Sequence, residues 1–246
     1  MIKFFRKIRQ QMLTKNQIGK YILYAIGEII LVVIGILIAL SINNWNNNNL
    51  RTNEEMNALS NMLLDLNLDI NAINNALKIH ENTLKTHIKF RKILLKQSPA
   101  NDSIGFFIRM LNSSSTPTFS SSTYKTISQT GLNLIQNDSL RNSIVKYYET
   151  LIPYLNEKAN LDPKFQFQIL LKPYYIKHLK LELNPNGSMK HSVNNLKKLL
   201  NDNEFLNELN LSINFRRRII RHHKIGIKHA ESLTQIINNE LKNRNN

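Results

Sequence analysis

The sequence predicts an all-α protein: an N-terminal transmembrane helix followed by an elongated antiparallel helical bundle, a coiled-coil-like domain outside the cytoplasm. Three observations lead to this fold class. An apolar run at residues 21–42 is long enough to cross a membrane. A longer stretch after it repeats apolar residues at alternating spacings of three and four, which is the period of a helix seam. Glycine and proline number only seven and six in 246 residues, which favours helices over a sheet-rich fold.

A basic segment, residues 1–20, precedes the apolar run and carries six Lys and Arg residues and no acid. Just after the run, Arg51 is followed closely by Glu54 and Glu55. Because short flanks rich in Lys and Arg stay cytoplasmic, we predict a single-pass protein with a cytoplasmic N-terminus and with residues 46–246 outside. Residues 39–41 loosely fit a signal-peptide cleavage site, but the long apolar run and the large basic segment favour an uncleaved anchor.

The length of the apolar run and three residues within it indicate possible partners. At about 1.5 Å per residue it forms a helix of about 33 Å, which spans the lipid bilayer, its first predicted partner. Glu28 is the only charge inside, and an intramembrane acid is a functional candidate because it is costly there. The alternative is a protonated Glu28 bonded to Tyr24, or one reaching toward the headgroups. Gly35 and Ala39 form a small-xxx-small pair, so they are candidates for a helix–helix contact.

The composition limits the compartment and the partners. The chain has no cysteine, which fits a bacterial envelope protein stabilised by packing alone, with its helical domain in the periplasm and its anchor in the inner membrane. The net charge is +16 and the pI is about 10.0. Such a charge suggests an anionic envelope component as a partner, or only a solvated lysine-rich surface. We do not expect nucleic acid, because that would require the domain to lie in the cytoplasm.

The stretch at residues 46–97 is predicted to be one long helix with a heptad seam at residues 56–94. The seam positions are Met56, Leu59, Leu63, Leu66, Ile70, Ile73, Leu77, His80, Leu84, His87, Arg91 and Leu94. Such a seam needs partner helices, either from its own chain or from a second copy in a homo-oligomer. Its second half is partly polar through His80, His87 and Arg91. These residues set the register or line a small-ligand pocket, and they lack the acid or Cys neighbours that a metal site needs.

Turn-forming residues at 98–102 end this helix, and a short apolar piece follows at 103–111. The Ser/Thr-rich stretch 112–123 is interpreted as an exposed linker loop. A short helix at 124–136 is interrupted at Gly131, and Asp138 is predicted to cap the next helix. Pro153 is expected to kink or end that helix.

Asp162 and Pro163 are predicted to start a helix that runs to residue 183 with a bend near Pro173. A turn at 184–187 ends it, and a shorter helix is expected at 188–200. Asp202 or Asn203 then opens the last helix, residues 204–242.

The last helix carries a broad apolar face with Arg216 and His223 near its centre, and a neighbouring basic stripe. The basic stripe consists of Arg217, Arg221, Lys224 and Lys228. If this helix packs antiparallel to the heptad helix, then His80, His87, Arg91, Arg216 and His223 meet in a polar, basic pocket for an anion. Structural polar contacts are the competing interpretation.

Two blocks resemble a family of uncharacterised single-span bacterial membrane proteins. The blocks are residues 20–45, KYILYAIGEIILVVIGILIALSINNW, and residues 124–149, YKTISQTGLNLIQNDSLRNSIVKYYE. The resemblance extends over nearly the whole chain and implies an uncleaved anchor and a helical outer domain. It implies no catalytic or binding residues, because the family has no established activity.

The sequence contains no recognisable catalytic signature. It lacks a cysteine nucleophile, a P-loop, a zinc-protease helix motif and a nucleotide-binding glycine pattern, so we expect neither an enzyme nor a cofactor or metal. We expect a membrane-anchored interaction protein of the cell envelope. The alternatives are a ligand-binding accessory that signals through a partner, and a binder of nucleic acid or anionic lipid if the topology is inverted.

Overall fold

The computed structural model describes residues 18–100 and 104–245, so the predicted basic segment lies almost entirely outside the described residues. The chain divides into two compact units, Met1–Glu55 and Met56–Asn246. The second unit begins about ten residues after the boundary expected from the sequence. Helix α2, Ile18–Leu94, contributes to both units, and each unit is described separately below.

In the first unit, the apolar part of α2 exposes its side chains. Leu23 is 77% exposed, Leu31 is 71% exposed and Ile29 is 62% exposed. The most apolar stretch of the helix has no buried residue, and its length and composition are those of a membrane span. Aliphatic side chains on every face of a helix are favourable in hydrocarbon and unfavourable in water.

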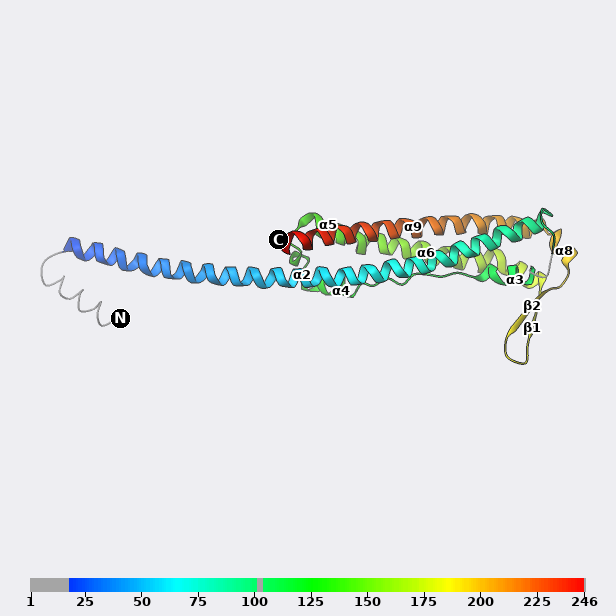
Figure 1. Ribbon diagram of the computed structural model, residues 1–246, viewed down its shortest axis with the longest axis horizontal. Helices are drawn as coiled ribbons and strands as arrows, with labels where there is room; N and C mark the ends of the chain where they lie inside the picture. The colour runs from blue at the N-terminus through cyan, green and yellow to red at the C-terminus, as the bar shows by residue number, and fades with distance from the viewer. Residues whose placement is uncertain (1–17, 101–103, 246) are drawn as a thin grey trace. The chain divides into compact units, whose positions relative to one another are not determined.

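The second unit is predominantly helical, which confirms the all-α fold class (Figure 1). After α2 the elements are the helices α3 (Ile104–Arg109), η1 (Met110–Asn112), α4 (Ser122–Thr130), η2 (Leu132–Leu134), α5 (Asp138–Val145), η3 (Lys146–Leu151), α6 (Ile152–Phe165), η4 (Gln166–Leu171) and α7 (Lys172–His178), the strands β1 (Leu179–Leu183) and β2 (Met189–Val193), and the helices α8 (Leu196–Leu200) and α9 (Asn203–Asn245). Segments η1 and η2 are 3₁₀ turns, whereas η3 and η4 are π-helical.

Helices α2 and α9 pack antiparallel, as expected. Leu59 and Leu66 of α2 share a core with Leu233 and Ile237 of α9, whereas Arg91 reaches Asn210 near the other end of α9. The continuous helical rod from α5 to α7 completes the bundle, with α6 beside α9 (Figure 1).

The buried face of α2 is rotated from the predicted seam. Of the seam residues, Leu59, Leu66, Ile73, His80, His87 and Leu94 are buried as predicted, but Met56, Leu63, Ile70, Leu77, Leu84 and Arg91 are only half-buried. The second buried row consists instead of Met62, Asp69, Ala76, Thr83 and Phe90. The prediction was wrong because the buried row contains two polar residues, Asp69 and Thr83. The half-buried row that the heptad pattern selected is mostly aliphatic. Asp69 is buried because it binds the connection to α4.

Two apolar layers make up the core of the second unit. The first apolar layer joins Leu59, Met62 and Leu66 to α4, α5, η3 and the C-terminal half of α9. Within it the rings of Tyr124 and Tyr148 stack at 4.5 Å between centroids. The second apolar layer joins the end of α2 to α3, α8 and the first turns of α9, and its members are Phe90, Ile93, Leu94, Ile104, Ile108, Leu111, Leu171, Leu179, Leu199, Phe205, Leu209 and Ile213.

Pro153 does not end its helix, and the helix start expected at Asp162 and Pro163 is wrong, because the rod continues through both places. A proline ring clashes with the carbonyl of the preceding turn in a regular α-helix. The π-helical segments η3 and η4 lie directly before Pro153 and near Pro173, and a widened turn relieves this clash. The cap of α5 is also displaced by one residue, since Asn137 and not Asp138 accepts from the amides of Ser139 and Leu140.

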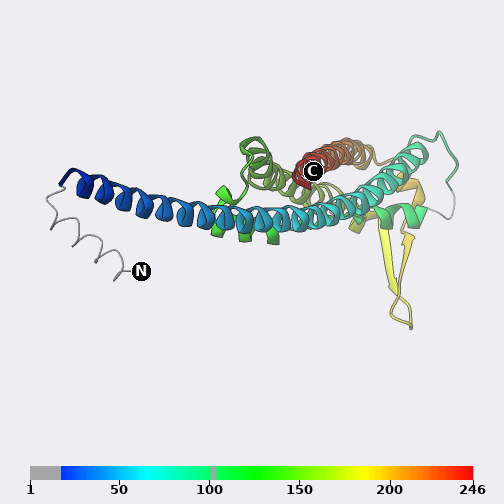
Figure 2. The same cartoon turned by 60° about the vertical axis from the view of Figure 1, so that its left-hand side comes forward.

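The helices expected at 163–183 and 188–200 are partly wrong, because the end of the first and the start of the second form the two strands of a β-hairpin. Strand β1 pairs antiparallel with β2, from Leu179 opposite Val193 to Leu183 opposite Met189. Figure 2 shows this hairpin extending away from the helices. The turn uses Gly187 at a φ of 79°, a conformation that side chains disfavour. The carbonyl of His191 lies against Gly105 of α3, where a Cβ atom has no room.

Candidate functional site

Between the two apolar layers, α2 and α9 face each other through polar residues. We call this group the polar layer: His80, Thr83 and His87 of α2, and Ser212, Arg216 and His223 of α9. All six are buried, although the helices around them have an otherwise apolar contact. Positions 216 and 223 are two turns apart, so their side chains leave α9 on the same face. The structure therefore brings together four of the five residues that the sequence grouped into a polar pocket.

Arg216 is the centre of the polar layer and is only 2% exposed. Its Nη1 donates to Nδ1 of His80 at 2.7 Å, and Nε2 of His80 donates to the carbonyl of Ser115 at 2.7 Å. Because a carbonyl only accepts and a guanidinium only donates, this chain assigns the proton of His80 to Nε2. His80 is thus a neutral ring that connects α9 to the loop before α4.

Burial lowers the pKa of all three histidines of the polar layer. The pKa of His80 falls to about 4 and that of His87 to about 3, because burial disfavours the charged ring and the Arg216 charge adds to the effect. The pKa of His223 falls to about 4 through burial and the neighbouring His222. The pKa of Arg216 also falls through burial, to about 10, so at neutral pH the guanidinium carries a charge and the three rings do not.

The remaining contacts in the polar layer are looser. The His223 ring meets the His80 ring edge-on, with 5.2 Å between centroids, and Ser212 Oγ lies 3.5 Å from His87 Nδ1. Arg91 is not part of the group, because it is half-buried and its Nε donates to Asn210 Oδ1 at 2.6 Å. In the described residues no cluster of His, Cys, Asp or Glu fits a metal ion.

The candidate residues in the first unit are half-buried or exposed. Glu28 is half-buried, whereas Ala39 is exposed and a Cβ added at Gly35 would meet no atom within 4 Å. The basic stripe of α9 is exposed in the second unit, and Lys224 in it pairs with Glu81 at 3.2 Å.

Asp65 and Asp69 form a site that the sequence analysis missed. Asp69 accepts from the Ser120 amide at 2.6 Å and from Tyr147 Oη at 2.9 Å, while Asp65 accepts from Ser120 Oγ at 2.7 Å and the Thr123 amide at 3.1 Å. Burial raises the pKa of Asp69 to about 6 despite these bonds. Burial acts in the same direction on Asp65, but its hydrogen bonds outweigh it and the pKa is lowered. The loop at 112–123 is therefore bound to α2 and is not a free linker.

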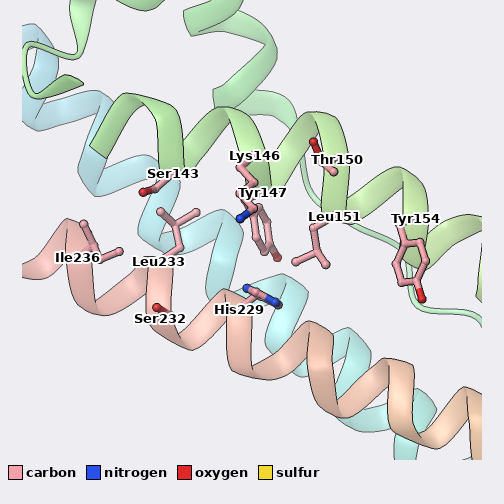
Figure 3. Close-up of a pocket in the computed structure, with 10 residues that line it drawn as sticks. All are labelled: Ser143, Lys146, Tyr147, Thr150, Leu151, Tyr154, His229, Ser232, Leu233 and Ile236. Atoms are coloured by element: carbon pink, nitrogen blue, oxygen red, sulfur yellow. The ribbon is translucent and has the colours of Figure 1, made fainter. Parts of the chain in front are cut away.

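A pocket of about 380 Å³ opens between the α5–α6 rod and α9 (Figure 3). Its lining combines aliphatic walls, four hydroxyl groups from serine, threonine and tyrosine beside that of the buried Tyr147, and two basic side chains. The lining residues are Ser143, Lys146, Tyr147, Thr150, Leu151, Tyr154, His229, Ser232, Leu233 and Ile236. Lys146 on the rod and His229 on α9 flank the pocket from opposite helices (Figure 3). No sequence motif indicated this pocket, because its two walls are about eighty residues apart.

These features define a class: a helical domain that continues from an apolar helix and contains a buried polar layer and an open, basic pocket. The chain belongs to a family of unknown function (DUF6090), whose model matches residues 28–213. The matched region includes part of the apolar helix, the polar layer up to Ser212 and the rod wall of the pocket. No curated protein and no solved structure matches the chain.

Proposed function

We propose that this protein is a single-pass membrane protein whose helical domain, outside the cytoplasm, binds a small amphipathic anion without transforming it. The observation that carries the proposal is the pocket between the rod and α9. Aliphatic walls from Leu151, Leu233 and Ile236 accommodate an apolar chain, while the Lys146 ammonium attracts an acidic head group and His229 offers it a ring N–H. Such an occupant is a medium-chain carboxylate or a molecule of similar chemistry.

The exposed apolar side chains of residues 22–42 support the membrane anchor. The basic flank before the anchor supports a cytoplasmic N-terminus and a periplasmic domain in the inner membrane of a bacterium. A domain that binds without chemistry transmits its state through a partner, and Glu28 in the anchor is the residue proposed to contact one.

Cysteine labelling tests the topology, because the chain has no cysteine of its own. Gln97→Cys and Asn186→Cys place thiols at exposed positions, and Leu66→Cys is a buried control. A membrane-impermeant maleimide is expected to label the two exposed positions once the outer barrier alone is opened. Labelling only after complete lysis would invert the topology and make nucleic acid or inner-leaflet lipid the better partner.

Thermal unfolding of the full chain in lipid nanodiscs tests the ligand class. A medium-chain fatty carboxylate is expected to raise the midpoint, and the alcohol of the same length is expected to raise it less, because it lacks the charge. Lys146→Met should remove the difference between the two probes. Lys125→Met, which removes an exposed lysine outside the pocket, should preserve it. Equal effects of both probes on the unmodified protein would contradict the proposal.

Binding of an anionic envelope component on the basic stripe is a second candidate function. Arg217, Arg221, Lys224 and Lys228 are all exposed along one face of α9. A contact of this kind weakens steeply with salt, whereas the pocket ligand should be less sensitive because its chain is buried. Co-sedimentation with anionic polymer at two salt concentrations, with Arg217 and Arg221 changed to Gln, separates the two.

Self-association through an exposed face of α2 is a third candidate function. The seam of α2 is largely covered by its own chain, but Leu64 and Leu68 are exposed by 63% and 60% one turn apart. They offer a surface to a second copy within the second unit, and Gly35 and Ala39 are separate candidates for such a contact within the anchor. Changing both leucines to Ser should convert a dimer into a monomer by mass photometry if this surface is used.

A further inference from the structure

The buried charge of Arg216 has no counter-charge in the described residues. Its only hydrogen-bond partner there is the neutral His80, and its Nε–H is buried with no partner. Burial lowers its pKa, and no carboxylate among the described residues forms an ion pair with it. An isolated buried ion is strongly unfavourable, and proteins pair such groups with an opposite charge.

The acids nearest the polar layer on α2 have other partners, whereas Glu208 on α9 lies two turns before Arg216, keeps a buried Oε2 without a partner and forms no hydrogen bond with Arg216. Glu81 pairs with Lys224, while Asp65 and Asp69 bind the loop before α4. Glu81, Asp65 and Asp69 therefore do not compensate the charge of Arg216 without breaking one of these contacts.

Two further nitrogens of the polar layer are buried without a partner, Nε2 of His87 and Nε2 of His223. The His223 ring lies against the same His80 that accepts from Arg216. The ring is 2% exposed, as is Arg216, so neither group is satisfied by bulk water. A neutral imidazole has one N–H, and with that proton on Nε2 the ring becomes a second donor beside the guanidinium.

We propose that the polar layer is a binding site for a small inorganic anion of the size of chloride, held by the Arg216 guanidinium and by Nε2–H of His223. One monovalent anion neutralises the one charge of the layer and accepts the hydrogen bonds that Nε–H of Arg216 and Nε2–H of His223 otherwise lack. A small ion is indicated because the layer is packed between two apolar layers, whereas the open pocket near Lys146 is lined by other residues. The anion then acts as a structural link between α2 and α9.

Exchange of the anion at constant ionic strength tests the site. Potassium gluconate, whose anion is too large for the layer, is replaced stepwise by potassium chloride while thermal unfolding of the full chain is followed. Screening of surface charges is the same in both salts. The midpoint of the unmodified protein is expected to rise with chloride concentration, by about 5–11 °C for an ion at a hundred times its dissociation constant.

Two variants separate the site from general salt effects. Arg216→Met removes the buried charge and should make the midpoint independent of chloride. Arg217→Met removes an exposed charge from the next position of α9 and should retain the full rise. An unmodified protein whose midpoint does not respond, or an Arg216→Met variant that responds equally, would overturn the proposal.

A direct measurement on the unmodified protein covers the case in which Arg216→Met does not fold. Crystals grown with bromide in place of chloride should show an anomalous peak within hydrogen-bond distance of the Arg216 guanidinium. A site with water alone and no anomalous signal would refute it.

Discussion

The first apolar layer and the polar layer lie along the same pair of helices with the same heptad period, yet different forces hold them. In the first apolar layer, Leu59, Met62 and Leu66 have no exposed surface and contact aliphatic and aromatic groups. In the polar layer, His80 and Arg216 occupy equally buried positions and are joined by a hydrogen bond of 2.7 Å. The two layers are therefore equally buried, and the kind of side chain decides what burial contributes to stability.

The energetic consequence differs in sign between the layers. Burying a leucine side chain contributes about 1.5–3 kcal/mol of favourable transfer free energy. Burying the Arg216 guanidinium costs free energy that a single neutral hydrogen bond does not offset. Burial in the apolar layers thus stabilises the domain, whereas burial of the Arg216 charge in the polar layer destabilises it. The polar layer instead fixes the register of α2 against α9 and holds a charge.

The largest expected effect is the response of the polar layer to acid. The pKa of His80 and His223 is about 4 and that of His87 about 3 in the folded chain, below the usual 6.5, so the unfolded chain binds more protons between these values. Stability is full above about pH 6.5 and falls as the pH approaches 4, by several kcal/mol, since one pKa unit is about 1.4 kcal/mol.

Asp69 opposes this trend only in part. Its folded pKa of about 6 lies above the usual 3.8, so it gains stability as pH falls through that window, but it is one group against three. Thermal unfolding midpoints measured from pH 7 to pH 4 test the combined effect of the three histidines and Asp69 on stability. His87→Gln should flatten the curve, whereas His229→Gln, an exposed control, should leave it unchanged. A midpoint that rises toward pH 4 would contradict the histidine account.

The next effect is a loss of packing in the first apolar layer. Leu66 is fully buried, so Leu66→Ala is expected to destabilise the domain by about 2–5 kcal/mol through lost transfer free energy and a residual cavity. Denaturant unfolding of the full chain measures it. Leu68→Ala is the matched control, because Leu68 is 60% exposed and its truncation should cost little. Equal losses for the two variants would show that the buried face of α2 has been misassigned.

A smaller effect of opposite sign is expected in the polar layer. In gluconate, Arg216→Met removes the uncompensated charge and keeps an unbranched side chain of similar length, so the domain should gain about 1 kcal/mol. The gain is limited because His80 Nδ1 loses its donor. Equilibrium unfolding in denaturant measures it beside Arg217→Met. A loss as large as that for Leu66→Ala would mean that Arg216 has a partner of opposite charge.

The sequence predicted the helical class and the antiparallel meeting of His80, His87, Arg216 and His223, because a period of three and four fixes which residues share a helix face. The same reasoning placed the second buried row of α2 incorrectly. Asp69 and Thr83 look like surface residues until the loop that binds Asp69 is known. That loop is remote in sequence, and its Ser/Thr content alone suggested a linker.

The β-hairpin and the long rod were missed for local reasons. Strand β1, with the sequence LKLEL, alternates apolar and charged residues before an Asn-Pro-Asn-Gly turn, which is a readable hairpin signal. It was overlooked because the surrounding elements are helical. Pro153 was expected to end its helix, but widening of the preceding turn into η3 is not encoded in any short motif. The pocket near Lys146 depends on which helices become neighbours, so the sequence alone does not reveal it.

The smallest expected effect lies at Gly226, on α9 between the first apolar layer and the polar layer. A Cβ there would lie 2.8 Å from Leu155 Cδ1 and 3.4 Å from Ile73 Cδ1, both of which are the ends of side chains that can rotate. Gly226→Ala also gains about 1 kcal/mol of helix propensity, so the two effects should cancel to within about 1 kcal/mol. Gly105→Ala is the contrasting variant, because its Cβ would meet the fixed backbone carbonyl of His191. Equilibrium unfolding should show a clear loss for Gly105→Ala and almost none for Gly226→Ala. A large loss at Gly226 would mean that the junction between the layers is too rigid for Leu155 to move.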